Sequence, residues 1–355
     1  MLISNYSESR VLFLSGGLLR AVAVTAFLLL AVVACSPAGD KGGDIPAVNE
    51  PIFWPAPPEV PRVRYLYQFS KPSDLGFRTP LFKRFLNLIA GGEDRFGMGR
   101  PYAIAADESL IVVADPGLKS LQLFHTDKRR YSEITGVGGV ELESPVGVAL
   151  GPERIYVADS SAGRVFILDR NGKSIGTITD VTRPTGIALH RGSGRLYVAD
   201  TLEHRIHIYD MEGKPVATFG ARGGAAGEFN FPSHLALYGE TLYVNDTMNF
   251  RIQAFDLDGR PLSAFGELGD GSGQFAQSKG VGMDSEGHIY VADALSNYVQ
   301  IFDPEGRLLL AFGGKGSAAG EFLLPAGLFI NRDRIYVVDS QNRRIQVFEY
   351  LRGDA

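Results

Sequence analysis

Six aspartates are the residues whose type and spacing first suggest chemistry, because carboxylates can bind calcium or act as general bases. A catalytic site breaks symmetry, however, whereas a residue that returns in every repeat is usually required by the repeat itself. We therefore expect each aspartate to accept hydrogen bonds from loop N–H groups or to pair with an arginine five positions later. The aspartates, 41 to 47 residues apart, are Asp115, Asp159, Asp200, Asp246, Asp293 and Asp339, and the arginines are Arg164, Arg205, Arg251 and Arg344.

Each aspartate closes one strand-like segment of a longer repeated pattern. In its clearest copies the pattern begins with Pro-x-Gly-aliphatic, at 145–148, 184–187 and 325–328, and continues with Tyr-Val-x-Asp. A third segment opens with Arg-Ile or Arg-Val, and a fourth ends in Phe-Gly. The segments are short and rich in Val, Ile and Tyr, which favours strands over helical repeats. Four strands per unit and a period in the forties predict an all-β fold, a six-bladed β-propeller of four-stranded antiparallel blades.

The sixth copy of the pattern reaches Tyr350 without a fourth strand. Residues 63–69 have the composition of a strand, and we expect them to complete this blade by pairing with 345–348. This closure would leave no open sheet edge between the ends of the ring. The predicted propeller domain therefore spans residues 63–352 and forms a monomeric ring.

Residues 80–90 interrupt the β pattern. Apolar side chains at 81, 82, 85, 86 and 89 would share one face of a helix that Pro80 can begin. We expect a short helix here. It either packs on the ring or, as a basic amphipathic helix, touches a membrane or a partner. Packing is the preferred interpretation, because so short a helix is marginal by itself.

Residues 1–34 have the features of an export signal. Arg10 and Arg20 precede an apolar run, 21–34, that is short for a membrane span. Residues 32–35 resemble the bacterial lipobox, and Cys35 is the only cysteine of the chain. We predict a lipoprotein signal peptide at 1–34, lipid on Cys35 as the membrane anchor, and a mature chain without disulfides.

Residues 35–62 are rich in Pro and Gly and have no apolar period, which predicts an extended tether. Ser36 after the cysteine resembles lipoproteins that two-membrane bacteria send to the outer membrane. The predicted location is therefore outside the cytoplasm and, in a Gram-negative host, the periplasmic or surface side of the outer membrane.

The region from Pro101 to Phe348 resembles the NHL-repeat family. The motifs that carry the resemblance are the Pro-x-Gly start, Tyr-Val-x-Asp, Asn-x-Arg-Ile at 249–252 and 342–345, and the Phe-Gly…Gly-x-Phe joints. With the lipobox and tether, the chain is similar to bacterial NHL-repeat lipoproteins. The resemblance implies a six-bladed propeller and says much less about activity, because such folds carry binding modules, sensors and enzymes.

Enzymes of related shape have metal requirements that this sequence does not meet. Lactonase-type propellers hold calcium on the axis, partly with residues between Pro and Gly of the first segment. The corresponding positions, which form no hard-cation ligand set, are Tyr102, Val146, Thr185, Ser233, Lys279 and Ala326. Amidating-lyase propellers use several histidines for zinc, whereas only His234 lies in a first segment here. We expect no metal, no cofactor and no catalysis; the alternative is a metal-assisted lyase or lactonase in the central channel, with His234 in its site.

Binding is the leading functional hypothesis. Loops after the second strands should share one face, and three adjacent copies place Leu202, Met248 and Leu295 two positions after the aspartate. Such an apolar arc is typical of a contact with a protein or peptide. The alternative is that these side chains fold inward between blades. The predicted partner-binding residues are Leu202, His204, Met248, Phe250, Leu295 and Tyr298.

The partner class stays open between a protein, a peptide and a glycan, since exposed Tyr, Asn and Arg can also stack on sugars. Nucleic acid is not expected. Binding of nucleic acid requires a dominant basic face on the protein, whereas this chain carries a net charge of −5 and is predicted to be exported.

Overall fold

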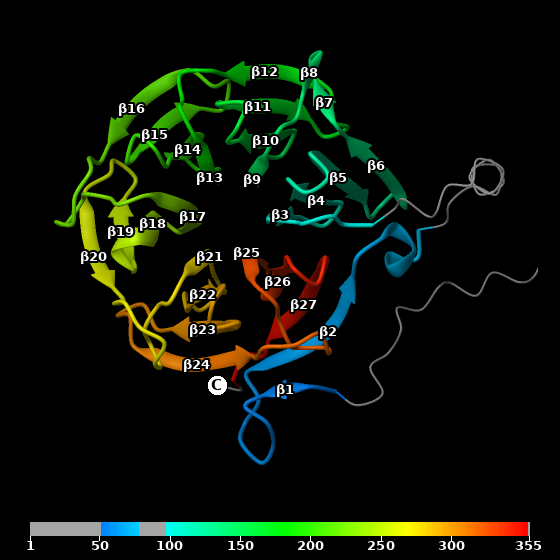
Figure 1. The fold of residues 1–355 in the computed structure, drawn as a ribbon, viewed down its shortest axis with the longest axis vertical. Helices are drawn as coiled ribbons and strands as arrows, with labels where there is room; N and C mark the ends of the chain where they lie inside the picture. The colour runs from blue at the N-terminus through cyan, green and yellow to red at the C-terminus, as the bar shows by residue number, and fades with distance from the viewer. Residues whose placement is uncertain (1–50, 78–96, 354–355) are drawn as a thin grey trace, which may run out of the picture. The chain divides into compact units, whose positions relative to one another are not determined.

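The computed structural model describes residues 51–77 and 97–353, whose strands form six antiparallel sheets arranged as blades around one axis (Figure 1). Within each blade the strands follow one another outward from the axis, and we name them A to D in that order. The inner A strands contact one another in sequence, and the sixth contacts the first, so the ring is closed. The prediction of an all-β, six-bladed propeller with four-stranded antiparallel blades is confirmed.

The first three blades each use four consecutive strands. Blade 1 contains β3 (Ala103–Ala106), β4 (Leu110–Asp115), β5 (Ser120–His125) and β6 (Arg130–Ile134). Blade 2 contains β9 (Pro145–Leu150), β10 (Arg154–Asp159), β11 (Arg164–Asp169) and β12 (Ser174–Ile178). Blade 3 contains β13 (Pro184–His190), β14 (Arg195–Asp200), β15 (Arg205–Asp210) and β16 (Pro215–Phe219). A small hairpin precedes blade 2 and consists of β7 (Gly136–Val137) and β8 (Val140–Glu141).

Blades 4 and 5 repeat this arrangement, and blade 6 departs from it. Blade 4 contains β17 (Pro232–Tyr238), β18 (Thr241–Asp246), β19 (Arg251–Asp256) and β20 (Pro261–Phe265). Blade 5 contains β21 (Ser278–Met283), β22 (Ile289–Asp293), β23 (Tyr298–Phe302) and β24 (Leu308–Gly313). Blade 6 contains β25 (Pro325–Asn331), β26 (Arg334–Asp339), β27 (Arg344–Tyr350), β2 (Val63–Phe69) and β1 (Phe53–Trp54).

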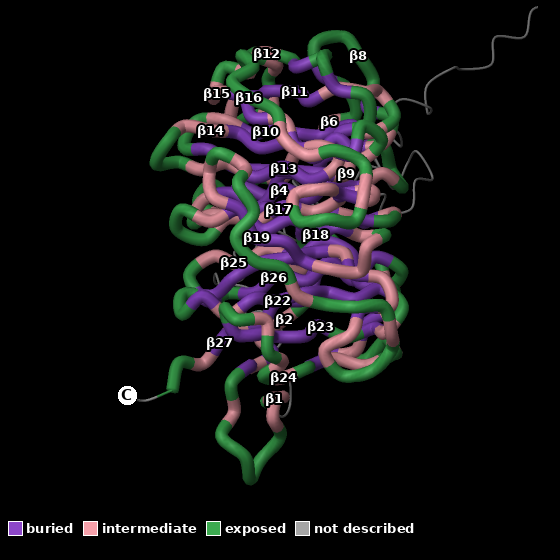
Figure 2. The backbone as a smooth tube through the Cα atoms, turned by 90° about the vertical axis from the view of Figure 1, so that its left-hand side faces the viewer, coloured by how far each residue is buried: buried purple, intermediate pink, exposed green. Residues whose placement is uncertain are grey.

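Burial follows the position of a strand within its blade (Figure 2). The B strands β10, β14 and β18 are buried at every residue after the first, because neighbouring blades cover both faces of the sheet. In the outer D strands, side chains alternate between exposed and partly buried, as in β12, or are mostly exposed, as in β16. The hydrophobic core therefore consists of apolar layers between the blades.

The N-terminal strand closes the ring as predicted. β2 pairs antiparallel with β27, from Val63 opposite Tyr350 to Phe69 opposite Ile345. The fold also begins earlier than expected, because β1 lies within the range assigned to the tether and pairs with β2. The ring of Trp54 lies 5.7 Å from those of Phe312 and Phe348, so the end of that proline-rich range is part of blade 6.

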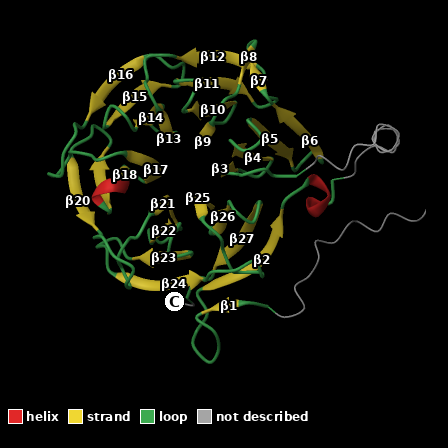
Figure 3. Ribbon diagram, in the orientation of Figure 1, coloured by secondary structure: helices red, strands yellow, loops and turns green. Residues whose placement is uncertain are grey.

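Helix contributes little to the described ranges (Figure 3), which contain the 3-10 turns η1 (Pro72–Leu75) and η2 (Thr247–Asn249). Neither turn has the length or the apolar run that a membrane crossing needs. The predicted signal peptide at 1–34, the lipidated Cys35, the tether as far as residue 50 and the helix near 80–90 all lie outside the described residues.

The glycine of the Pro-x-Gly motif lets neighbouring A strands approach each other. A Cβ atom on Gly147 would lie 1.9 Å from the carbonyl oxygen of Thr185, and one on Gly186 would lie 2.4 Å from that of Ser233. No side chain fits at such distances. Blade 4 is an exception, because His234 occupies the equivalent position.

Candidate functional site

The loops of the ring lie on two opposite sides, and each side offers a different candidate site. The A–B face carries the loops between strands A and B and between C and D. The B–C face carries the loops between strands B and C and the joints between blades. This division follows from the antiparallel order of each blade.

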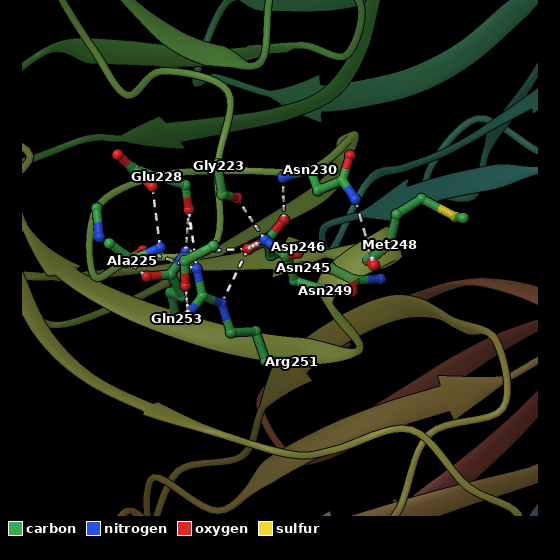
Figure 4. A network of polar contacts seen from close by, with 12 residues as sticks. Gly223, Ala225, Glu228, Asn230, Asn245, Asp246, Met248, Asn249, Arg251 and Gln253 are labelled. Carbon is green, nitrogen blue, oxygen red and sulfur yellow. Dashed lines mark hydrogen bonds and ion pairs between the residues drawn. The ribbon is translucent and has the colours of Figure 1, made fainter.

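The six repeated aspartates are fully buried at the B–C face and hold its backbone together. Each accepts a hydrogen bond from a backbone N–H just before the A strand of its blade. Asp246 shows the pattern, with the Asn230 N–H at 2.6 Å and the Nδ2 of Asn249 at 2.8 Å (Figure 4). These carboxylates are engaged within the fold, which leaves them poorly suited to catalysis.

Two of the four arginines reach their aspartates. Nε of Arg251 lies 2.9 Å from Asp246, and its other nitrogens donate to the carbonyls of Gly224, Ala225 and Glu228 in the preceding joint (Figure 4). Arg344 makes the corresponding set of bonds with Asp339 and with the joint before blade 6. Each of these arginines clamps a glycine-rich joint against its blade.

The other two arginines do not pair as expected. Arg164 donates to the carbonyl of Ala162, and Arg205 donates to that of Glu203. The joint before blade 2 contains the β7–β8 hairpin, and the joint before blade 3, residues 179–183, is short and has no glycine.

Four of the six predicted partner-binding residues are exposed on the B–C face. The exposed fractions are 46% for Leu202, 50% for Met248, 58% for Leu295 and 44% for Tyr298. These residues belong to adjacent blades 3, 4 and 5, and we call them the apolar arc. They do not fold inward between the blades.

Of the other two predicted residues, His204 is wrong as a surface contact, whereas Phe250 is only partly covered. His204 is buried, since its ring packs 4.6 Å from that of Phe231 and its Nδ1 accepts the Phe231 N–H. Phe250 is partly buried and packs on the core layer between blades 4 and 5. The loop composition around them gave no sign of this burial, because the covering groups come from other segments of the chain.

Blade 5 differs from its neighbours at the apolar arc. Tyr298 occupies the position that Arg251 and Arg344 hold in blades 4 and 6, so this blade lacks the arginine clamp. Leu324, which the sequence pattern did not single out, is 38% exposed. Its N–H donates to the side chain of Asn297, so Leu324 lies close to Tyr298, the next residue in the chain. The arc therefore gains a further apolar residue from the joint before blade 6.

The A–B face opens into a cavity of about 990 Å³ on the axis of the ring. Its walls are the A strands, and its lining includes no residue of a B–C loop. Aliphatic residues of the A strands border the cavity in two layers, although most of the surface that the cavity exposes is polar. The layer nearer the B–C face is Ile104, Val148, Ile187, Leu235, Val281 and Leu328, and the layer nearer the mouth is Ala106, Leu150, Leu189, Leu237, Met283 and Ile330.

His234 lies at the inner end of this cavity. The Tyr102 ring stacks on its imidazole, with centroids 5.5 Å apart, and the Lys279 ammonium lies 6.0 Å from the Tyr102 centroid. Nδ1 of His234 lies 3.1 Å from Oγ of Ser233, whereas Nε2 is buried and has no hydrogen-bond partner among the described residues. Burial and the Lys279 charge lower the pKa of His234 to about 3, so the imidazole is neutral at physiological pH.

Asn245 fixes the backbone beside His234. Four other copies carry alanine at this B-strand position. The buried Asn245 side chain donates to the Lys279 carbonyl at 2.8 Å and accepts from Oγ of Ser278 at 2.8 Å. This carbonyl is the equivalent of those that exclude a side chain at Gly147 and Gly186. His234 and Asn245, which both depart from the residue type of most other copies, thus lie close together near the axis, between blades 4 and 5.

Charged residues ring the mouth of the cavity. Its lining contains four acidic and four basic residues at this end: Asp107, Glu108, Asp127, Glu153, Lys128, Arg170, Arg191 and Arg332. Arg170 contacts Asp107 at 2.7 Å, and Arg332 pairs with Glu108. The mouth is therefore polar with balanced charge.

A metal site does not fit this cavity. Within residues 51–77 and 97–353, no group of three or more His, Cys, Asp or Glu side chains is placed to hold a metal ion. His234 supplies one nitrogen at the inner end, where its ring neighbours are a tyrosine and a lysine, and zinc requires three or four ligands.

The comparisons with known proteins agree with the fold. Residues 235–312 match the family described as SMP-30/Gluconolactonase/LRE-like region, and residues 281–352 match a family described as 6-bladed beta-propeller. Each match covers about a fifth of the chain. No curated protein matches the sequence.

Several solved structures are similar in fold. A streptogramin B lyase aligns with a TM-score of 0.55 at 11% identity, covering 72% of this chain and 94% of the lyase. Virginiamycin B lyase from Staphylococcus aureus gives 0.53 at 12% identity, over 71% and 96% of the two chains. Hydrazine synthase from Kuenenia stuttgartiensis gives 0.52 at 14% identity, over 73% and 98%. At these identities the likeness shows the fold alone.

Proposed function

We propose that this protein is a lipid-anchored, extracytoplasmic binding protein of the NHL-repeat type that holds a protein or peptide partner on its B–C face. The single observation that carries the proposal is the apolar arc. Leu202, Met248 and Leu295 occupy equivalent loop positions of three adjacent blades and are each about half exposed. Side chains of this size on one face are costly to leave in water unless a partner covers them.

The composition of the arc fits a protein or peptide better than a glycan. Its members are two leucines, a methionine and a tyrosine, with another leucine at the joint. Leucine and methionine offer flexible apolar surface, which suits side chains of a partner. Glycan recognition would require more aromatic and polar groups. The lipobox-like sequence at Cys35 supports the location, since it would hold the ring at a membrane surface.

Charging the arc tests this proposal. A chain with Leu202, Met248 and Leu295 replaced by Asp should lose its partner in crosslinking pull-downs from intact cells. Thermal unfolding should change by no more than a few degrees, because exposed positions contribute little to stability. The matched control is Leu262→Asp, at a 59% exposed leucine of the outer strand β20, which should keep the partner.

Two results would contradict the proposal. One is a triple variant that still captures the same partner as the parent chain. The other is a triple variant that fails to fold while Leu262→Asp folds normally, which would show that the arc is structural.

The runner-up is a lyase or lactonase that acts in the axial cavity. It is favoured by the match of residues 235–312 to the gluconolactonase-like family and by His234, the one histidine that an A strand contributes to the cavity lining. A Staphylococcus aureus virginiamycin B lyase in which a histidine is replaced by alanine is catalytically inactive. The ligands of this cavity do not suit a metal, so a metal-assisted mechanism is disfavoured.

Metal analysis of the purified chain separates the two proposals. Binding by the arc predicts no more than trace metal. Calcium or zinc in a one-to-one ratio with protein, lost on His234→Leu, would favour the enzyme.

A further inference from the structure

The residues between Pro and Gly of the repeat form a layer around the axis at the B–C face, which we call the axial layer. Along each A strand this layer comes two residues before the cavity layer that contains Ile104, so it lies closer to the B–C face. Its members are Tyr102, Val146, Thr185, Ser233, Lys279 and Ala326, of which Val146 also lines the cavity. The axial layer therefore belongs mainly to the face that carries the apolar arc.

Lys279 carries a charge that the axial layer does not neutralise. Its side chain is partly exposed, and the ammonium keeps accessible surface while making no hydrogen bond or ion pair within residues 51–77 and 97–353. It lies 6.0 Å from the centroid of the Tyr102 ring. The six repeated aspartates are fully buried and hydrogen-bonded within their own blades, so they do not supply the counter-charge. A partly buried cation in this condition attracts an anion.

Residues that depart from the repeat hold Lys279 in place. Asn245 stands where four other copies have alanine, and it donates to the Lys279 carbonyl at 2.8 Å. The same side chain accepts from Oγ of Ser278, the residue before the lysine. His234 of blade 4 stacks on Tyr102 of the opposite blade 1, so the ring beside the ammonium is held as well. The lysine is thus positioned on the axis by both its backbone and its aromatic neighbour.

The axial layer is continuous with the apolar arc. Thr201 and Thr247 each stand directly before a member of the arc in the chain. Their hydroxyls bond to the axial layer, Thr201 to Thr185 at 2.7 Å and Thr247 to Ser233 at 2.6 Å. One surface therefore leads from apolar side chains on the loops, across hydroxyl groups, to an ammonium near the axis.

We propose that the partner on the B–C face presents a carboxylate that pairs with the Lys279 ammonium, while apolar side chains of the same partner cover the arc. The single negative charge of a carboxylate balances the single positive charge, whereas a phosphate group would bring more than one. A peptide offers a carboxylate at its C-terminal end or on an Asp or Glu side chain. The inference rests on the proposed binding function and adds the chemistry of the partner.

Binding of defined peptides to the full chain in lipid nanodiscs tests the inference. The probes are three libraries of short peptides, immobilised through their N-termini, with the same random sequences of Leu, Met, Phe, Ala and Ser. The first library ends in a free carboxylate, the second ends in an amide, and the third ends in an amide but contains one Glu. We expect peptides of the first or the third library to bind about 10-fold more tightly than the matching amides, because the amides lack a charge-assisted hydrogen bond. The library that binds identifies the chain end or the side chain as the source of the carboxylate.

Substitutions at the lysine and at the arc separate the two contacts. Lys279→Met should weaken binding of the carboxylate peptides about 10-fold, to the level of the amides, and leave the amides unchanged. Lys279→Arg keeps the charge and should keep the preference. The matched control is Lys315→Met, at an exposed lysine of the joint before blade 6 on the same face, which should bind like the parent chain. The triple Asp variant of the arc should lose the amide peptides as well.

Thermal unfolding of every variant shows whether the ring is intact. Equal affinity of the parent chain for carboxylates and amides, or a preference that persists in a folded Lys279→Met chain, would overturn the inference while loss of binding in the triple variant still supports the arc. Peptides that bind the triple variant as tightly as the parent would instead contradict the proposed function. If no library binds, the inference is also overturned, and the crosslinking pull-down decides the proposed function by itself.

Discussion

At the scale of single residues, the buried polar groups differ in how many of their hydrogen bonds the fold supplies. The six aspartates use their oxygens on backbone N–H groups and side chains of their own blade, so the regular spacing that suggested chemistry has a structural cause. His234 is the opposite case. It occurs once, stands where four other blades have glycine, and keeps a nitrogen without a partner among the described residues.

Arg251 should contribute strongly to stability. Replacing it with alanine leaves three joint carbonyls and part of the Asp246 carboxylate without their donor, and we expect the free energy of unfolding to fall by about 3 kcal/mol. Urea denaturation measures this change. Arg205→Ala is the matched control, because the Arg205 side chain is 42% exposed and makes one long bond, so the change should stay within about 0.5 kcal/mol. Equal effects would show that the clamp is unimportant.

His234 should make the fold sensitive to acid. Its pKa is lowered to about 3 in the folded protein, whereas an unfolded histidine titrates near about 6.5, so the unfolded state binds the extra proton between these values. Stability is present above that window and is lost as the pH falls through it. In His234→Gln, the slope of unfolding free energy against pH should be smaller by about 1.4 kcal/mol per pH unit.

The comparison of the two chains isolates this group, because the lowered pKa values of His125 and His207 act in both. Parallel curves for parent and variant, measured by denaturation across the acid range, would contradict the assignment.

At the scale of elements, β1 and β2 determine how the ring is sealed. Trp54, the only tryptophan, packs on Phe312 of blade 5 and Phe348 of blade 6, so it bridges the two blades next to the closing strand. Its fluorescence therefore reports on the seam alone. A Cβ atom on Gly320 would lie 2.7 Å from the indole, which shows how closely the joint is packed there.

Trp54→Ala should lower the free energy of unfolding by about 2 kcal/mol, because it removes a large ring from a partly buried aromatic cluster. Circular dichroism during urea denaturation measures the change without relying on tryptophan emission. Val60→Ala, at a 69% exposed position of the same segment, should be neutral. A neutral Trp54→Ala would mean that β1 is not part of the stabilising core.

At the scale of the whole ring, the sequence predicted the architecture better than the sites. Blade number followed from the spacing of the aspartates, and closure followed from the missing fourth strand of the last copy. A residue that recurs at a regular spacing and a strand that is missing from the last copy can both be recognised in the linear sequence. β1 was missed because Trp54 is held by rings from distant strands and not by any local alternation.

The sites depend on contacts that no single segment determines. His204 was predicted to be exposed, but Phe231 from the next joint covers it. The cavity was not predicted in size or lining, because its width depends on how closely the six A strands approach one another, with glycine at the contact in blades 2, 3, 5 and 6. The exposed part of the arc could be predicted, since Leu202, Met248 and Leu295 occupy equivalent loop positions in their blades.

The seam in blade 6 brings the two ends of the described chain together. Leu351 donates to the carbonyl of Arg62 at 2.8 Å, and Val63 pairs with Tyr350. Because these two segments are already adjacent, the same blades could form in the same order if the chain were joined here and opened elsewhere. A circularly permuted gene that joins these ends by a short linker and opens the β7–β8 hairpin between Gly138 and Gly139 should encode the same ring.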